Sequence, residues 1–162
     1  MAGTETHIII DTAHQVMTLH QSQRRNVCYP ISTSSYGLGE QTGSYKTPRG
    51  RHIVRAKIGQ GTPINGVFVG RRYTHEIYSP ELGEAYPERD WILTRILWLC
   101  GCELGINRLG SVDTMRRFIY IHGTPDSEPM GKPASHGCIR MANKDIIDLF
   151  ELIQLGCSVT IS

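Results

Sequence analysis

The chain has 162 residues, 40% hydrophobic and 20% charged, so it is long enough for one globular domain and too apolar for a disordered protein. Its formal charge of +2 comes from basic residues spread along the sequence, whereas nucleic-acid-binding proteins gather them on one face. No apolar stretch is long enough to cross a membrane. We therefore expect a single domain over residues 1–162 that binds neither nucleic acid nor membrane.

The N-terminal sequence MAGTETHIIIDT lacks a basic segment followed by an apolar stretch and a small-residue cleavage site. This favours a cytoplasmic location, with a periplasmic one as the alternative if a leader has been removed. The five cysteines are odd in number and show no disulfide spacing, which indicates free thiols. Cys100 and Cys102 are too close together for a zinc knuckle, so no structural metal is expected.

The first half of the chain has the pattern of β-structure. Apolar runs and alternating stretches are separated by segments rich in Gly, Ser, Thr and Pro, and Pro30 favours a sheet edge or a bulge in its strand. The predicted strands cover residues 6–11, 14–21, 27–33, 51–59 and 64–78.

The second half contains two further strands before a helix. Residues 91–101 are almost continuously apolar, and their tryptophans and isoleucines favour a buried strand over a helix. Residues 115–123 alternate, which predicts a strand with Phe118, Tyr120 and His122 on one face.

The C-terminal segment predicts one helix followed by a last strand. Asn143 is expected to cap the helix and Gly156 to end it. Helical spacing links Ile146, Leu149, Phe150 and Ile153. The fold class is therefore mainly β, a sandwich or barrel-like arrangement of mixed sheets with one C-terminal helix and short helical turns.

The chemistry is concentrated in the segment IHGTPDSEPMGKPASHGCIR, residues 121–140. A metal site would use His122, His136 and Cys138, but the last two are only two residues apart and no fourth ligand is evident. A cysteine nucleophile needs a thiol of lowered pKa and a base within hydrogen-bond reach that a third group orients, and this segment has the residues to supply them, with Cys138 as the thiol and His122 as the base. Ser135 with His136 as its base is disfavoured, because neighbours on a tight loop rarely face each other.

The loop around Cys138 suits acyl transfer. Gly137 has no side chain to block a substrate carbonyl, so the N–H groups of Gly137 and Cys138 are candidates for an oxyanion hole. A protonated His122 beside the sulfur would lower the pKa of the thiol and keep it ionised at neutral pH.

The same residues resemble the signature of the L,D-transpeptidase catalytic domain, also called the YkuD domain. In that signature a histidine and a spacer precede Ser/Thr-His-Gly-Cys, and here His122 is followed by GTPDSEPMGKPA and SHGC. The segments YPISTSSYG, GSYKTPRGRHIV and the strand leading into IHGTPD look like family segments in the same order. The resemblance thus covers nearly the full length and implies a β-sandwich-like mixed domain.

The resemblance implies roles for individual residues. Cys138 matches the acylated nucleophile, and His122 matches the histidine that pairs with its sulfur. Gly123 matches the position whose backbone carbonyl holds the other ring nitrogen. The frame of the nucleophile loop is matched by Ser135, His136 and Gly137.

Substrate-binding residues are less clearly marked. Arg140 stands where the family often has asparagine, a variant also found in the family. A guanidinium can bind a carboxylate at two points, so Arg140 is our candidate for the substrate's terminal carboxylate, ahead of Lys132 and Arg108. A purely structural role for Arg140 fits the sequence equally well. Tyr120 and Tyr45 are candidates for lining the groove, although strand aromatics more often lie in the core.

The activity that the resemblance implies is cysteine-dependent acyl transfer, without cofactor or metal, on a peptidoglycan tetrapeptide or muropeptide. Cys138 would attack the diaminopimelate carbonyl joined to the terminal D-alanine, and His122 would protonate the departing amine. Water as acceptor makes the enzyme an L,D-carboxypeptidase of peptidoglycan recycling, which the leaderless sequence favours. An amine as acceptor makes it a cross-linking L,D-transpeptidase. The non-enzyme alternative is an inactive wall-peptide binding module.

Overall fold

The computed structural model describes residues 5–162, and its regular secondary structure is mainly β. Within these residues no helix is both long and apolar enough to cross a membrane. The helical elements are α1 (Pro80–Ala85), the single 3-10 turn η1 (Gly110–Val112) and α2 (Asn143–Leu152). The strands are β1 (Thr6–Asp11), β2 (Val16–Gln21), β3 (Val27–Ser32), β4 (Gly50–Ile58), β5 (Gly66–Val69), β6 (Arg72–Ile77), β7 (Ile92–Gly101), β8 (Tyr120–Gly123), β9 (Ile139–Met141) and β10 (Ser158–Ile161).

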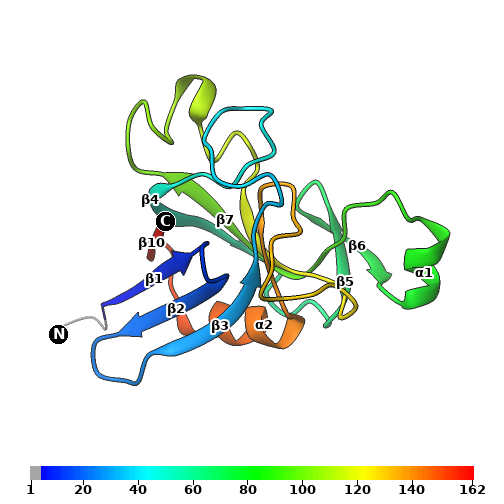
Figure 1. The fold of residues 1–162 in the computed structure, drawn as a ribbon. Helices are drawn as coiled ribbons and strands as arrows, with labels where there is room; N and C mark the ends of the chain where they lie inside the picture. The colour runs from blue at the N-terminus through cyan, green and yellow to red at the C-terminus, as the bar shows by residue number, and fades with distance from the viewer. Residues whose placement is uncertain (1–4) are drawn as a thin grey trace.

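Eight of the strands close into a barrel. Hydrogen-bonded neighbours follow the order β4-β10-β1-β2-β3-β9-β8-β7, and β7 also pairs with β4, which closes the ring (Figure 1). Most pairs are antiparallel, but β1 runs parallel to β10 and β8 runs parallel to β9. The predicted mainly β fold with mixed sheets is confirmed, in its barrel-like form.

Alternating side chains fill the barrel. Ile8 and Ile10 of β1 and Met17 and Leu19 of β2 are fully buried, while the residues between them keep some exposure, as the period of two predicts. Helix α2 packs against β7 and β8. Its buried apolar side chains are Ile146, Leu149 and Phe150. The helix therefore supports the strand that carries His122.

The strand predicted over residues 115–123 is shorter than expected. Only β8 is extended, because the preceding residues form turns in which Arg117 N–H donates to Asp113 O and Phe118 N–H donates to Met115 O. Phe118 has a left-handed φ of 56° and is 53% exposed. The prediction that Phe118 shares a strand face with Tyr120 is therefore wrong.

The boundaries of α2 also differ from the prediction. Ala142 occupies the N-cap position, and Asn143 is the first helical residue. The side-chain amide of Asn143 donates to Thr124 O at 3.0 Å instead of capping the helix. The helix ends at Leu152, and Gly156, with φ 85°, lies in the turn before β10. Asn143 thus ties the helix to the segment that follows β8.

Pro30 does not mark a sheet edge, because β3 lies between β2 and β9. Pro30 pairs with Val16 on β2, while pairing with β9 begins only at Ile31. The missing N–H of proline therefore interrupts no hydrogen bond between β3 and β9.

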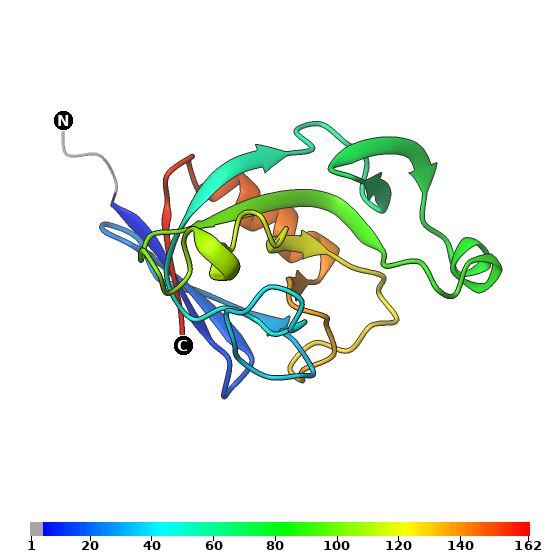
Figure 2. The ribbon, with the colours of Figure 1, turned by 90° about the horizontal axis from the view of Figure 1, so that it is seen from above.

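The hairpin of β5 and β6 extends the sheet beyond the barrel. β5 pairs with β7 on one side and with β6 on the other. Helix α1 follows, with Pro80 in its first turn and the Ser79 hydroxyl accepting from Leu82 N–H. Figure 2 shows the hairpin and α1 projecting to one side of the barrel, away from the C-terminus.

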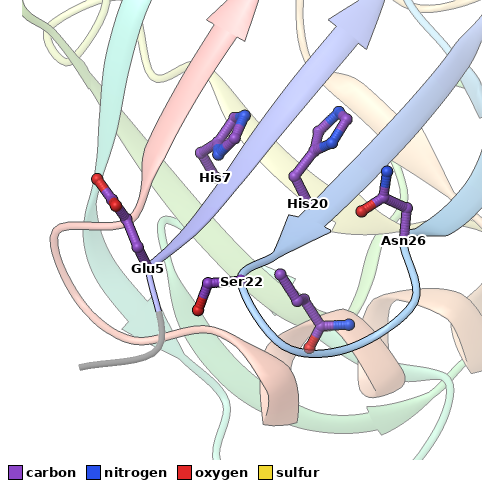
Figure 3. A pocket seen from close by; sticks show the side chains of 6 residues that line it. Glu5, His7, His20, Ser22 and Asn26 are labelled. Atoms are coloured by element: carbon purple, nitrogen blue, oxygen red, sulfur yellow. The ribbon is translucent and has the colours of Figure 1, made fainter. Parts of the chain in front are cut away.

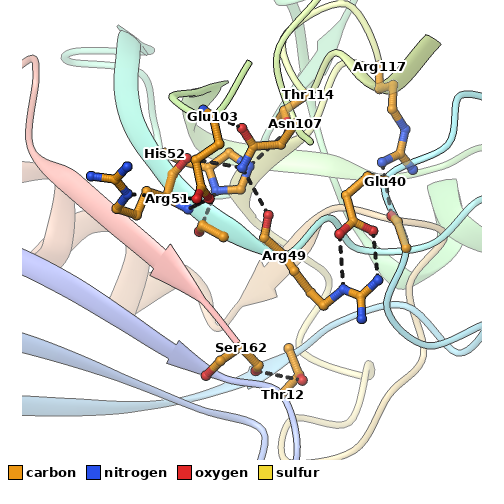
Figure 4. Close-up of polar contacts among 12 residues, drawn as sticks. Thr12, Glu40, Arg49, Arg51, His52, Glu103, Asn107, Thr114, Arg117 and Ser162 are labelled. Atoms are coloured by element: carbon orange, nitrogen blue, oxygen red, sulfur yellow. Dashed lines mark hydrogen bonds and ion pairs between the residues drawn. The ribbon is translucent and has the colours of Figure 1, made fainter. Parts of the chain in front are cut away.

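A buried polar network joins β4 to the segment after β7 (Figure 4). His52 is 1% exposed, with Nε2 2.9 Å from Thr114 Oγ1 and Nδ1 3.0 Å from Gly50 O. Glu103 accepts from Arg51 N–H at 2.8 Å. Burial lowers the pKa of His52 to about 4, so this histidine is neutral at pH 7.

A shallow pocket of about 360 Å³ lies beside β1 and β2 (Figure 3). His7 and His20 face each other across these strands with stacked rings whose centroids are 4.7 Å apart. The other lining residues are Glu5, Gln21, Ser22 and Asn26. No residue of the predicted nucleophile segment lines this pocket, so it lies apart from the candidate site.

Candidate active site

The nucleophile loop and the histidine strand meet where β8 and β9 pair. The two strands are parallel with His122 opposite Arg140, which places Cys138, just before β9, opposite Tyr120. Successive side chains on a strand alternate between faces, so these four residues point to the same face. The topology thus brings the predicted nucleophile and the predicted base to one surface from residues 16 apart in the sequence.

The Cys138 sulfur has two backbone partners. It accepts from Tyr120 N–H at 3.3 Å and donates to Phe118 O at 3.4 Å. Within residues 5–162, no hydrogen bond joins the sulfur to His122. Catalytic hydrogen bonds are often long before substrate binds. The pairing of Cys138 with His122 is therefore judged from their position on the same face of β8 and β9.

His122 is held in one orientation by its own backbone. The side chain is 1% exposed, and Nδ1 lies 2.6 Å from Gly123 O. A proton on Nδ1 donates to this carbonyl and leaves Nε2 as the acceptor for a thiol proton. A side chain at Gly123 would contact Asn143 and lie 2.6 Å from Leu93 O, so the close packing favours glycine there.

The protonation states differ from the expectation of an ionised thiolate. Burial raises the pKa of the Cys138 thiol to about 12 and lowers the pKa of the His122 imidazole. Asp90 acts on Cys138 in the same direction as burial, whereas Arg140 opposes it. The resting site therefore contains a neutral thiol and a neutral imidazole, which is the protonation state a general base requires.

Ser135 and Thr47 fix the nucleophile loop. Ser135 Oγ donates to Cys138 O at 2.6 Å, and Thr47 Oγ1 donates to Gly137 O at 2.9 Å. Gly137 has a φ of 131°, a conformation that side-chain-bearing residues rarely adopt. Thr47 lies in the segment GSYKTPRG that carried part of the resemblance, but its contact with the loop was not predicted.

Two of the predicted loop roles look different in the structure. Gly137 N–H donates to Ser135 Oγ at 3.3 Å, so of the two proposed oxyanion donors Cys138 N–H alone lacks a hydrogen-bond partner within residues 5–162. His136 makes no hydrogen bond in the same part of the chain; its exposed ring lies 6.3 Å, centroid to centroid, from that of Tyr36. His136 therefore lines the site and does not hold the loop.

A groove of about 390 Å³ runs past Arg140, within the usual size of small-molecule sites. The Arg140 guanidinium lies 3.5 Å from Asp90 and 3.6 Å from Glu128, and it donates to Ala134 O at 3.2 Å. Thr124 and His136 also line the groove. The two carboxylates were not predicted, because they belong to no motif and come from different loops.

The remaining predicted residues are scattered. Tyr120 is 5% exposed, and its hydroxyl accepts from Arg71 at 2.9 Å. Tyr45 is 61% exposed. Lys132 and Arg108 are exposed and do not line the groove. Arg140 is thus the one predicted cation in the groove, and it already has acidic partners.

The three residues considered as metal ligands from the sequence are His122, His136 and Cys138. Among residues 5–162 no three His, Cys, Asp or Glu side chains converge as a metal site. His122 is buried, whereas His136 faces solvent, so the three ligands considered from the sequence do not come together.

The model of the L,D-transpeptidase catalytic domain (YkuD) matches residues 5–161. The chain belongs to the YkuD family. Relatives include the Bacillus subtilis protein YkuD, 50% identical over 42 residues, which are 26% of each chain. YbiS of Escherichia coli K12 is 26% identical over 162 residues, covering 94% of this chain and 46% of the relative. The matched stretches therefore cover less than half the length of these curated relatives.

Solved structures share the fold. An L,D-transpeptidase from Mycobacterium smegmatis has a TM-score of 0.58 at 17% identity, covering 99% of this chain and 59% of that one. The L,D-transpeptidase LdtMt1, solved in complex with imipenem, has a TM-score of 0.59 at 16% identity and covers 99% of this chain and 60% of that one. At these identities the similarity establishes the YkuD-domain fold alone.

Proposed function

We propose that this YkuD domain catalyses acyl transfer on peptidoglycan stem peptides through a thioester on Cys138. The observation that carries the proposal is the common face of Cys138 and His122, with His122 oriented by Gly123 O at 2.6 Å. The raised pKa of Cys138 and the lowered pKa of His122 favour a neutral thiol and a neutral imidazole. These protonation states suit a reaction in which His122 accepts the thiol proton during attack.

The proposed reaction has two balanced halves. In the first, His122 Nε2 takes the thiol proton, sulfur bonds to the carbonyl carbon of the third stem residue, and the bond to D-alanine breaks as its amine receives that proton. In the second, the acceptor loses a proton to His122, attacks the thioester carbonyl and releases the sulfur, which regains the proton. Cys138 N–H is placed to stabilise the oxyanion in both halves.

An amine acceptor is the first candidate for the second half. Asp90 and Glu128 line the groove next to Arg140 and would attract an acceptor ammonium group. The relatives carry the name L,D-transpeptidase. Transfer to an amine would make a peptidoglycan cross-link.

Hydrolysis to a tripeptide is the second candidate and would make the protein an L,D-carboxypeptidase. The side chains of Asp90 and Glu128 are 57% and 40% exposed, so water reaches the groove. A cytoplasmic location, tested by a reporter fusion, belongs with this candidate, because soluble recycled tetrapeptides would then be the substrate.

The test is product analysis by mass spectrometry after incubation with disaccharide tetrapeptide, alone and with excess amine acceptor. Dimer formation supports transpeptidation, and tripeptide without dimer supports hydrolysis. Binding without either product would leave the inactive wall-peptide module as the better description. Cys138→Ala is the control in each reaction.

A further inference from the structure

A second arginine, Arg71, lies in the turn between β5 and β6 and contacts aromatic side chains that surround Cys138. The guanidinium carbon of Arg71 is 4.4 Å from the ring centroid of Trp98 and 5.1 Å from that of Phe118. Nη1 donates to the Tyr120 hydroxyl at 2.9 Å. Three aromatic side chains therefore hold this guanidinium in one place.

The same aromatic residues contact the nucleophile through their backbones. Phe118 O and Tyr120 N–H are the two hydrogen-bond partners of the Cys138 sulfur. The side chains of Phe118 and Tyr120 contact Arg71. These two residues therefore connect the Arg71 guanidinium to the Cys138 sulfur. Trp98 lies directly across from Tyr120 in the β7–β8 pair.

The charges of Arg71 and Arg140 are compensated differently. Arg140 has the carboxylates of Asp90 and Glu128 within 4 Å, whereas Arg71 has no ion-pair partner within residues 5–162. Arg71 is half-buried and stacked, so it loses little side-chain entropy when it binds an anion. An uncompensated, pre-oriented guanidinium is suited to bind a carboxylate in two places.

The proposed reaction decides which part of the substrate reaches Arg71. The leaving amine must lie by His122, so the terminal residue extends along β8 toward Arg140 and the groove. The acyl half then leaves the sulfur in another direction, toward Tyr120, which lies opposite Cys138 on β8 and whose hydroxyl accepts from Arg71. This reasoning rests on the proposed function.

We propose that Arg71 is a specificity-determining residue that binds the side-chain carboxylate of the third stem residue in the acyl donor. A donor with diaminopimelate at that position carries this carboxylate. A donor whose side-chain carboxylate is a primary amide has almost the same shape without the negative charge.

The test compares these two tetrapeptides with wild-type protein, Arg71→Gln, Arg71→Lys and, as a matched control from the same turn, Arg72→Gln. Arg72 is exposed, and its side chain has no ion pair within residues 5–162. We expect Arg71→Gln to lower kcat/KM for the carboxylate donor about tenfold or more, mainly through KM, and for the amide donor less than twofold. Arg71→Lys should recover part of the loss, and Arg72→Gln should match wild type.

Equal losses on both donors, or no loss on the carboxylate donor, would overturn the assignment. The dissociation constants of both donors for Cys138→Ala, with and without Arg71→Gln, give a second readout that needs no turnover. Weaker binding of the carboxylate donor alone when Arg71 is replaced supports the assignment. An equal effect of Arg71→Gln on the two dissociation constants, or no effect on either, contradicts it. If wild-type protein processes neither donor, the proposed function fails, and these dissociation constants still decide the role of Arg71.

Discussion

His122 Nδ1 lies 2.6 Å from the carbonyl oxygen of Gly123, the next residue in β8. A proton on Nδ1 donates to this carbonyl and leaves Nε2 free to accept a proton. The ring of the proposed base is thus oriented by a backbone carbonyl and not by a third side chain.

Replacement of this base should remove catalysis without unfolding the barrel. We expect His122→Asn to lower kcat on tetrapeptide at least about 100-fold, because an amide cannot accept the thiol proton. The measurement is D-alanine release, with circular dichroism to verify folding. His14→Asn, at an exposed turn, is the control and should keep wild-type activity. Retention of more than a tenth of the activity by His122→Asn would contradict its role as base.

The ionisation of Cys138 can be followed by alkylation. Since burial raises the pKa of this thiol to about 12, the rate of reaction with iodoacetamide should rise continuously from pH 6 to pH 10. Mass spectrometry of the peptide that contains Cys138 separates it from the exposed Cys28 and Cys102. A rate that is already at its plateau at pH 6 would show a thiolate–imidazolium pair and contradict the neutral resting state.

Arg140 should matter more for stability than for substrate affinity. Its partners Asp90 and Glu128 belong to different loops, so Arg140→Gln is expected to cost about 1 kcal/mol and lower the Tm, with KM for tetrapeptide changed less than about threefold. Arg55→Gln, at an exposed position on β4, is the control. A tenfold rise in KM at unchanged Tm would instead assign Arg140 to the substrate's terminal carboxylate.

His52 predicts how stability depends on pH. The pKa of His52 is about 4 in the folded protein and about 6.5 in the unfolded protein. Its contribution to the free energy of unfolding is therefore complete above pH 6.5 and is lost as the pH falls toward 4. The loss amounts to about 3 kcal/mol at pH 4. Urea unfolding at several pH values should show a shallower decline for His52→Gln than for wild type. The buried His122 adds to the decline in both proteins, so the difference reports His52, and parallel curves would contradict this account.

The sequence predicted the local features of this domain better than its spatial contacts. Apolar runs and alternating stretches located most strands, as in β1 and β2. Periodicity failed at residues 115–119, where Asp113 and a left-handed Phe118 form turns within an apparently alternating stretch. The motif identified Cys138 and His122, but Arg71, Asp90 and Thr47 reach the site from distant segments. Their roles depend on tertiary contacts that no local pattern encodes.

The central claim is that Cys138 carries the acyl group. The direct measurement is intact-protein mass spectrometry after rapid acid quench of wild-type protein mixed with disaccharide tetrapeptide, with release of D-alanine measured in parallel. We expect the protein mass to increase by the substrate less D-alanine, with the adduct on the Cys138 peptide after digestion, and neither adduct nor D-alanine with Cys138→Ala. Release of D-alanine by Cys138→Ala at the wild-type rate, or turnover by wild type with the acyl group on another residue, would contradict it.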